Sequence, residues 1–341
     1  MGRTPRRVIT SLLTLGVIAS SIGVADAARR SDAGRVRSAI GYLATQQQPN
    51  GSIPAFSPIG STADAVLAIV AAGTGKQQLH AAIGYLRRQA LAGHVSIVGL
   101  QAKVAAAAVA GGRDPRAFGG INLVKALRST IDPNGRFGDA AVFDDALAVI
   151  ALEAADVKIP PLVTQWLLDA QCPDGGWQYD GPALTDEDEH CFSIADPASD
   201  FFGSDTNTTS YVVQAIEAAG GAMYPHDPIA FFADIRDAAH GGWGYTWGFQ
   251  TTDANSTALA IQALISSGEA LPSGALAALR ALQDPDCGGW SFTWLDDPSG
   301  SIPDGPNPGA TIGAVLGILR TPLPVEPGPV HGHAPAEPGC G

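Results

Sequence analysis

The sequence predicts an all-α fold, an (α/α)6 toroid in which six helix hairpins close into a ring. Within its 341 residues the chain repeats the corner Gly-Gly-Trp three times, at 175–177, 241–243 and 288–290. An Ala- and Leu-rich helical pattern follows each corner, and it recurs six times at a spacing of about 40 residues. A single unit of that size cannot bury its apolar face, so neighbouring units must stack.

The inner helices are predicted from six segments that superpose without a gap. Ser, Thr or Asp begins most of them, which suits a residue that caps a helix, and Gly ends several, which suits a left-handed helix end. Small and β-branched apolar residues lie nearly all the way round, as is typical of enclosed helices. The segments are 61–73, 100–112, 144–156, 208–220, 256–268 and 310–322.

The outer helices are predicted from the amphipathic segments that precede the inner ones. They carry Arg, Lys and Asp among Leu, Ile and Tyr, so one stripe should pack inward while the other meets water. Turn sequences such as Pro-Asn-Gly and Asp-Gly-Gly separate them from the inner helices. The six segments are 39–47, 81–89, 121–129, 162–171, 229–237 and 275–283.

The two ends of the chain differ from the repeats. Three arginines precede an apolar run over residues 8–24, and Ala25-Asp26-Ala27 has the form of a cleavage site, so residues 1–27 are predicted to be a signal peptide. Arg6-Arg7 leaves a twin-arginine route open. Residues 28–320 form the toroid, and the Pro- and Gly-rich residues 321–341 are predicted to be a disordered tail. We therefore expect a secreted or cell-envelope protein.

Charge restricts the partners. The formal net charge is -13, and removal of the signal peptide, with three Arg and one Asp, makes it -15. Such a charge disfavours nucleic acid and anionic membranes. No apolar run is long enough to span a membrane. The acidic run 186–189 is interpreted as a solvated loop, since its spacing matches no calcium loop, and no metal site is predicted.

The four cysteines indicate a disulfide in an exported protein. Cys172 and Cys191 bracket a long charged insertion and are the preferred pair, because a bridge would restrain that insertion. Cys287 is a competing partner for Cys172, and Cys340 could be free or paired between chains. His190 adds a third zinc-ligand type nearby, but the spacing is poor for zinc.

At residues 171–177 and 283–290 the sequence resembles the Gln-to-Trp repeats of triterpene cyclases and of protein prenyltransferase β subunits. The resemblance extends over nearly the whole mature chain and implies the (α/α)6 toroid. Residues 253–264 resemble a helix of the transcobalamin and intrinsic-factor toroid, which implies a cobalamin-like ligand. These motifs define the fold far better than the function.

The resemblance to each family implies chemistry that can be sought in the sequence. Squalene-hopene-type cyclases use Asp-x-Asp-Asp, and the nearest string here is Val142-Phe143-Asp144-Asp145. If the protein is an enzyme, Asp144 and Asp145 are the expected catalytic pair, although Val142 replaces the first Asp. The Cys and His zinc ligands of prenyltransferases are missing from the inner-helix starts. The second domains of cyclases and cobalamin carriers are also missing.

Ligand contacts are predicted at one level of the ring. The second position of every inner segment is polar, and equivalent positions of a toroid lie at one height. Five positions deeper, Gln214 and Gln262 interrupt an apolar lining. Asn255 stands just before the segment that contains Gln262. Helix capping and inter-helix hydrogen bonds remain open as alternatives. The six predicted rim residues are Thr62, Gln101, Asp145, Thr209, Thr257 and Thr311.

The function predicted from these patterns is that of an exported, non-catalytic toroid. Its expected partner is a small hydrophobic or amphipathic molecule, a cobalamin-like ligand included, or an envelope protein. A terpenoid cyclase or prenyltransferase-like enzyme is the competing class. A structural or adhesive envelope module is the third.

Overall fold

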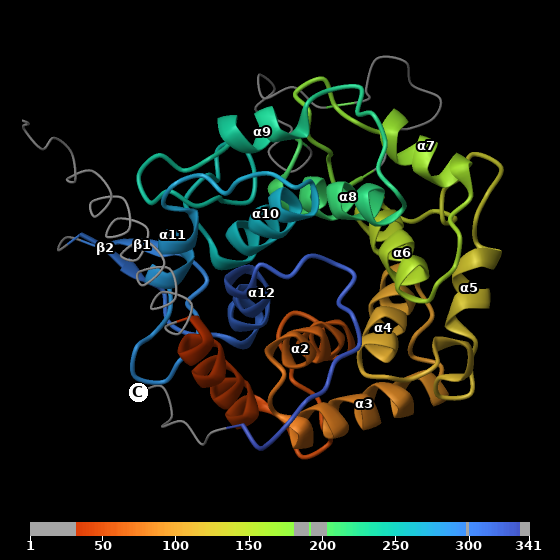
Figure 1. The fold of residues 1–341 in the computed structure, drawn as a ribbon, viewed down its shortest axis with the longest axis horizontal. Helices are drawn as coiled ribbons and strands as arrows, with labels where there is room; N and C mark the ends of the chain where they lie inside the picture. The colour runs from red at the N-terminus through yellow and green to blue at the C-terminus, as the bar shows by residue number, and fades with distance from the viewer. Residues whose placement is uncertain (1–31, 181–190, 192–202, 298–299, 335–341) are drawn as a thin grey trace, which may run out of the picture.

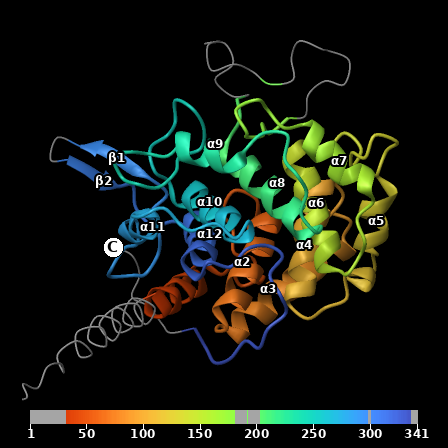
Figure 2. The same ribbon diagram turned by 45° about the horizontal axis from the view of Figure 1, so that its top comes forward.

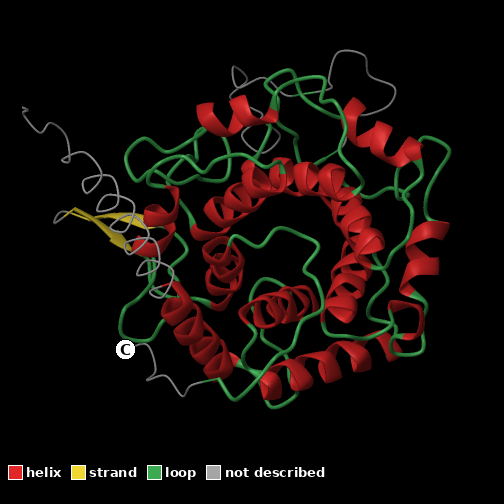
Figure 3. Ribbon diagram, in the orientation of Figure 1, coloured by secondary structure: helices red, strands yellow, loops and turns green. Residues whose placement is uncertain are grey.

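The helices form two concentric rings. The structure, a computed structural model, describes residues 32–180, 191, 203–297 and 300–334. The inner ring consists of α2 (Pro58–Ala72), α4 (Val98–Ala110), α6 (Val142–Ala154), α8 (Thr206–Ala218), α10 (Ala254–Ser266) and α12 (Pro308–Leu319). The outer ring consists of a helix over 32–46, α3 (Lys76–Leu91), α5 (Leu123–Ser129), α7 (Pro161–Asp169), α9 (Pro228–Asp234) and α11 (Ala275–Ala281). Figures 1 and 3 show both rings.

The inner ring is closed. Each inner helix packs on the next, and α12 packs on α2. In the outer ring, Arg280 on α11 donates two hydrogen bonds of 2.7 Å to Asp32 on the first helix. These contacts join the last repeat to the first. The predicted all-α toroid is thus confirmed.

Two small elements decorate the rings. A short 3-10 helix, η1 (Pro115–Ala117), precedes α5. An antiparallel hairpin of β1 (Trp294–Asp297) and β2 (Gly300–Pro303) precedes α12, with Trp294 opposite Pro303. The hairpin, which the repeat pattern does not predict, stands outside the rings beside α11 in Figure 2.

The Gly-Gly-Trp corners are turns that bury a tryptophan between the rings. The first glycine has a positive φ in all three corners, 88° at Gly175 for example, a conformation that favours glycine. Each tryptophan is fully buried. Its indole N–H donates to a carbonyl of the outer helix, as from Trp177 to Leu167 at 2.6 Å, and Trp243 and Trp290 repeat this contact. The corner therefore fixes the outer helix to the inner one.

A glutamine before the corner links adjacent repeats. The side-chain amide of Gln171 donates to the carbonyls of Gly175 and His226, and its carbonyl accepts from the backbone N–H of His226 at 2.9 Å. Gln283 donates in the same way to Gly288 and to Arg35 of the first repeat. Each Gln therefore bonds both its own corner and the backbone of the next outer helix or of the residues just before it.

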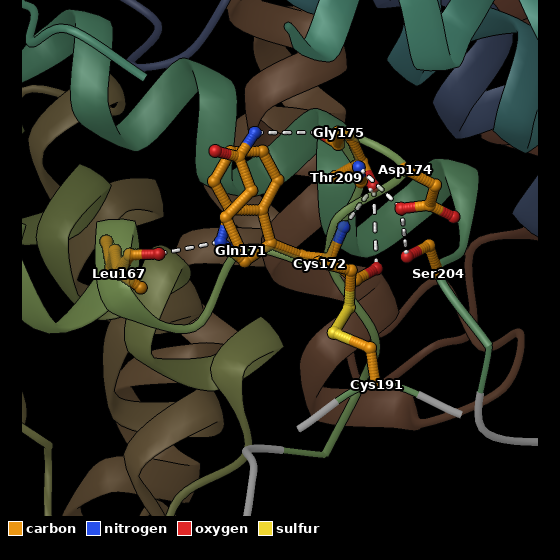
Figure 4. The surroundings of a disulfide bond; sticks show 10 residues. Leu167, Gln171, Cys172, Asp174, Gly175, Cys191, Ser204 and Thr209 are labelled. Carbon is orange, nitrogen blue, oxygen red and sulfur yellow. Dashed lines mark hydrogen bonds between the residues drawn. A yellow bond between two sulfur atoms is a disulfide. The ribbon is translucent and has the colours of Figure 1, made fainter. Parts of the chain in front are cut away.

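The disulfide joins Cys172 to Cys191, with the two Cα atoms 5.5 Å apart (Figure 4), which confirms the preferred pair. Asp174 lies beside it and accepts from the Ser204 hydroxyl at 2.8 Å. Cys287 is not the partner of Cys172, and it is not a free thiol. The predicted signal peptide, the acidic run 186–189, His190 and Cys340 lie outside the described residues.

The residues after α12 pack against the rings. Leu323 and Val325 are 7% and 5% exposed. His331 pairs with the backbone beside Thr74, donating its N–H to Gly73 and accepting from Gly75. The predicted disorder is therefore wrong for residues 321–334, because apolar side chains among the prolines find a surface to cover. Within the described ranges, no helix has the length and apolarity needed to cross a membrane.

Candidate binding cavity

A cavity of about 240 Å³ lies inside the inner ring and is lined by all six inner helices. With Gly60, Ser61 and Thr62 taken as positions 0, 1 and 2 of the first repeat, the lining falls mainly on positions 0, 4 and 7. These share one helix face. Position 4 lines the cavity in all six repeats, through Asp64, Lys103, Leu147, Tyr211, Leu259 and Gly313.

The walls of the cavity are largely apolar. Leu67, Ile150 and Leu316 contribute from the deeper turns. Leu323, just beyond the end of α12, lines the same space. The cavity thus reaches from the first turns of the inner helices to the segment 321–334, which crosses the ring in Figure 1.

An ion pair lies in the wall between α2 and α4. The Lys103 ammonium is 2.6 Å from a carboxylate oxygen of Asp64, and both side chains are half-buried. Burial alone would lower the pKa of Lys103, but the Asp64 carboxylate raises it above its ordinary value. Burial also raises the pKa of Tyr211 to about 12, so this phenol stays neutral. Tyr211 packs edge-on against Phe143, with ring centroids 4.8 Å apart.

The predicted rim residues do not line the cavity. In five of the six repeats the side chain at position 2 instead accepts a hydrogen bond from a corner backbone N–H. The hydroxyl of Thr62 accepts from Ile53, that of Thr209 from Trp177, that of Thr257 from Trp243 and that of Thr311 from Trp290, all at 2.8 to 3.0 Å. Position 2 lies roughly 200° from positions 0 and 4, so it faces the outer ring. The expectation that these residues ring the mouth is corrected accordingly.

Asp145 and Gln101 occupy the same position in the remaining repeats. Asp145 accepts from the Phe137 backbone N–H at 3.1 Å and from the Trp166 indole at 2.8 Å. Burial raises its pKa to about 7 against these hydrogen bonds. Gln101 donates to the Ser96 carbonyl at 3.2 Å. Neither is a cavity residue.

Asp144, the other candidate of the Asp-Asp pair, is half-buried at the start of α6. Burial raises its pKa, and the nearby Lys103 ammonium opposes the rise. Asp144 is not among the residues that line the cavity. Asp145 therefore contacts the outer ring, whereas Asp144 lies beside the Lys103 ammonium.

Three other predicted contacts are placed differently from the rim. Asn255 and Gln262 line the cavity. Gln214, at position 7 of its repeat like Gln262, does not line it, and its carbonyl accepts from the Leu323 N–H at 2.8 Å. It thus holds the segment that closes the ring. Of the predicted ligand contacts, the structure brings Asn255 and Gln262 to the cavity.

Asp64, Lys103 and Tyr211 line the cavity but were not predicted from the sequence. The signal was present, because Asp64 and Lys103 occupy the same aligned position of adjacent inner helices and interrupt an apolar pattern. A charge of each sign on neighbouring enclosed helices indicates a pair. Across the described residues, no three His, Cys, Asp or Glu side chains gather closely enough to hold a metal ion.

Solved structures of other proteins share this fold. No protein-family model matches the chain, and no relative is found among curated proteins. The type II terpene cyclase MstE from Scytonema is similar in structure, without ligand at 15% identity and a TM-score of 0.57, over 86% of this chain and 98% of MstE. A variant of MstE in complex with its substrate geranylgeranyl dihydroxybenzoate gives 14% identity and a TM-score of 0.59 over the same shares.

A crystal structure of a protein from Actinoplanes matches at 19% identity and a TM-score of 0.51, over 85% of this chain and 99% of that one. Identities this low establish the fold alone. The matches do not support the resemblance to the transcobalamin toroid. This chain therefore has the toroid fold of type II terpene cyclases.

Proposed function

We propose that the toroid is a non-catalytic module that binds a small, mainly apolar molecule in its central cavity. The observation that carries the proposal is the apolar lining contributed by all six inner helices. Ligand sites are typically concave and apolar with a few polar groups, which describes this cavity. MstE forms a complex with a prenylated substrate, so the fold accommodates such a ligand in at least one protein.

The size of the cavity limits the ligand. An engineered cavity of ~150 Å³ binds benzene, so 240 Å³ corresponds to a molecule of about ten carbon atoms. A corrin macrocycle is far larger than this, and a cobalamin-like ligand is therefore not part of the proposal.

The absence of turnover is proposed from the two aspartates. Protonation of an alkene requires an acidic carboxyl that stays protonated beside the substrate. Burial raises the pKa of both carboxyls, but the Lys103 ammonium opposes this rise at Asp144, and both oxygens of Asp145 already accept N–H donors. Neither side chain lines the cavity. Val142 also replaces the carboxylate that precedes the pair in cyclases.

Export stays part of the proposal. The disulfide between Cys172 and Cys191 suits an oxidising compartment, and residues 1–27 are predicted from the sequence to be a signal peptide. The ligand would then be met outside the cytoplasm or in the envelope. N-terminal sequencing of secreted protein is expected to begin at Ala28.

Two measurements test the proposal. Native mass spectrometry of protein purified from its own host should reveal a retained small molecule, and calorimetric titration with ten-carbon terpenoids should give saturable binding. Leu259→Trp fills the cavity from α10 and should abolish that binding while far-ultraviolet circular dichroism is preserved. A Trp placed at the exposed Leu162 on α7 is the matched control. Product formation from a prenyl substrate, lost in Asp144→Asn, would overturn the proposal in favour of a cyclase.

A further inference from the structure

Gln262 has a buried acceptor that no described residue satisfies. Its side chain is 1% exposed and lines the cavity. The amide nitrogen donates to the Ala258 carbonyl at 3.1 Å, whereas Oε1 has no hydrogen-bond partner among the described residues. Flipping the amide would set its oxygen against the Ala258 carbonyl, so the hydrogen bond defines the orientation. The carbonyl oxygen is thus left for another donor.

Gln214 provides an internal comparison. It occupies the equivalent position on α8, the neighbouring inner helix, and its amide makes the same bond one turn back, to Ser210 at 3.1 Å. Its Oε1, however, accepts from the Leu323 N–H at 2.8 Å. The two glutamines make the same backbone bond, but only the carbonyl oxygen of Gln214 has a donor among the described residues. A buried acceptor without a donor costs free energy, so the site favours a molecule that supplies one.

The charged side chains in the wall of the cavity indicate that this molecule is neutral. Lys103 and Asp64 neutralise each other at 2.6 Å. A charged ligand inside the apolar part would find no free counterion among the described lining residues, and burying an unpaired charge is expensive. Asn207 also lines the cavity, seven helix positions or about 10 Å from the level of Gln262 toward the first turns. It adds a second acceptor oxygen that has no partner among the described residues, and it adds no positive charge.

We propose that Gln262 is a specificity-determining residue that selects a neutral, mainly apolar ligand carrying a hydrogen-bond donor, such as a hydroxyl, over the corresponding hydrocarbon. The inference rests on the proposed function, since it names the class of molecule that the same cavity takes. The ligand hydroxyl donates to Oε1 of Gln262, and its carbon skeleton packs against Leu259, Ile150 and Leu316.

Four probe molecules with nearly the same carbon skeleton separate the contributions of the hydroxyl donor, the oxygen atom and a negative charge to binding. Menthol has a hydroxyl donor, menthyl methyl ether keeps the oxygen without the donor, p-menthane has neither, and menthane-3-carboxylic acid is an anion at pH 8. Menthol should bind the unmodified protein about three- to tenfold more tightly than the ether or the hydrocarbon, as expected for one neutral hydrogen bond. The anion should bind at least tenfold more weakly than menthol.

The variants assign the preference to one atom. In Gln262→Met, which keeps length and apolar volume, the ratio of menthol to p-menthane affinity should fall to about one. In Gln214→Met the ratio should persist, even where the loss of the Leu323 contact weakens both probes together. A menthol preference that survives Gln262→Met, or equal binding of menthol and p-menthane to the unmodified protein, overturns the inference while the binding function stands. If no probe binds at all, the proposed function fails and the inference fails with it.

Discussion

A carboxylate oxygen of Asp145 accepts the indole N–H of Trp166 at 2.8 Å, and the other oxygen accepts the Phe137 backbone N–H at 3.1 Å. Asp145 therefore accepts a corner backbone N–H, as Thr209, Thr257 and Thr311 do in their repeats, and it accepts an indole N–H as well. In Asp145→Asn the amide nitrogen must face one of the two donors. We expect the variant to lose about 1–3 kcal/mol of unfolding free energy, because a buried donor loses its partner.

Ligand affinity should be nearly unaffected by Asp145→Asn, since the side chain points to the outer ring. Urea unfolding and calorimetric titration of the same preparation measure the two effects. A variant of full stability that no longer binds would show that Asp145 belongs to the site.

The ring of helices could be predicted from the sequence, whereas the face that each inner helix turns toward the cavity could not. Repeat spacing, corner glycines and caps are local signals that predicted the fold class correctly. The disulfide was predicted correctly from two cysteines that bracket one charged insertion. Because the inner helices are apolar all round, no amphipathic stripe distinguishes the face toward the cavity from that toward the outer ring. The sequence therefore predicts the polar residues of position 2, such as Thr62, at the mouth of the ring. In the structure the Thr62 hydroxyl instead accepts a hydrogen bond from the Ile53 backbone N–H of the corner.

Gln262 could be predicted because an amide interrupts an apolar pattern wherever it faces, and Asn255 because it stands just before the same predicted helix. Asp64 and Lys103 were not predicted, because pairing two charges on different repeats requires the helices to be placed in space. The contact of Leu323 with Gln214 spans 109 residues and has no local signal at all.

The ion pair of Asp64 and Lys103 should be coupled. Lys103→Met leaves a half-buried carboxylate without its counterion and should cost about 1–3 kcal/mol of unfolding free energy. Adding Asp64→Leu should restore much of that loss, because an apolar pair needs no compensation. A double-mutant cycle in urea at two salt concentrations measures the coupling, and strictly additive losses would contradict it.

Leu323 should stabilise the protein by closing the cavity. Its side chain is 7% exposed and lines the space, so Leu323→Ala is expected to cost about 2–3 kcal/mol. Val330→Ala, on the same segment but outside the cavity lining, should cost about 1 kcal/mol or less. Thermal unfolding compares the two variants. Equal effects would mean that the segment is held by its pairing near Thr74 rather than by the cavity.

The stability of the protein should depend on pH through Asp205. Asp205 caps α8 through one oxygen, which accepts from the Thr208 N–H at 2.7 Å, while its other oxygen is buried and has no partner among the described residues. Burial raises the pKa of Asp205 to about 7, against about 3.9 for an unfolded aspartate.

The folded state therefore binds the proton more tightly than the unfolded state between pH 4 and 7. Stability from this group is fully present below about pH 4 and is lost as the pH rises to about 7. In Asp205→Asn the cap is kept, because Asn caps as well as Asp, and the ionisation is removed. The variant should be more stable than the unmodified protein at pH 8, by about 1–3 kcal/mol, and no more stable at pH 4.

Asp227→Asn is the matched control, since Asp227 caps α9 at an exposed position and accepts from the Ile229 N–H. Its slope of stability against pH should follow that of the unmodified protein. Urea unfolding at pH 4, 6 and 8 measures all three proteins. Removing the carboxylate is favourable at high pH only if its charge is uncompensated in the folded protein. If the slope of stability against pH is the same in Asp205→Asn as in the unmodified protein, the carboxylate finds a donor and stays ionised, which contradicts the prediction.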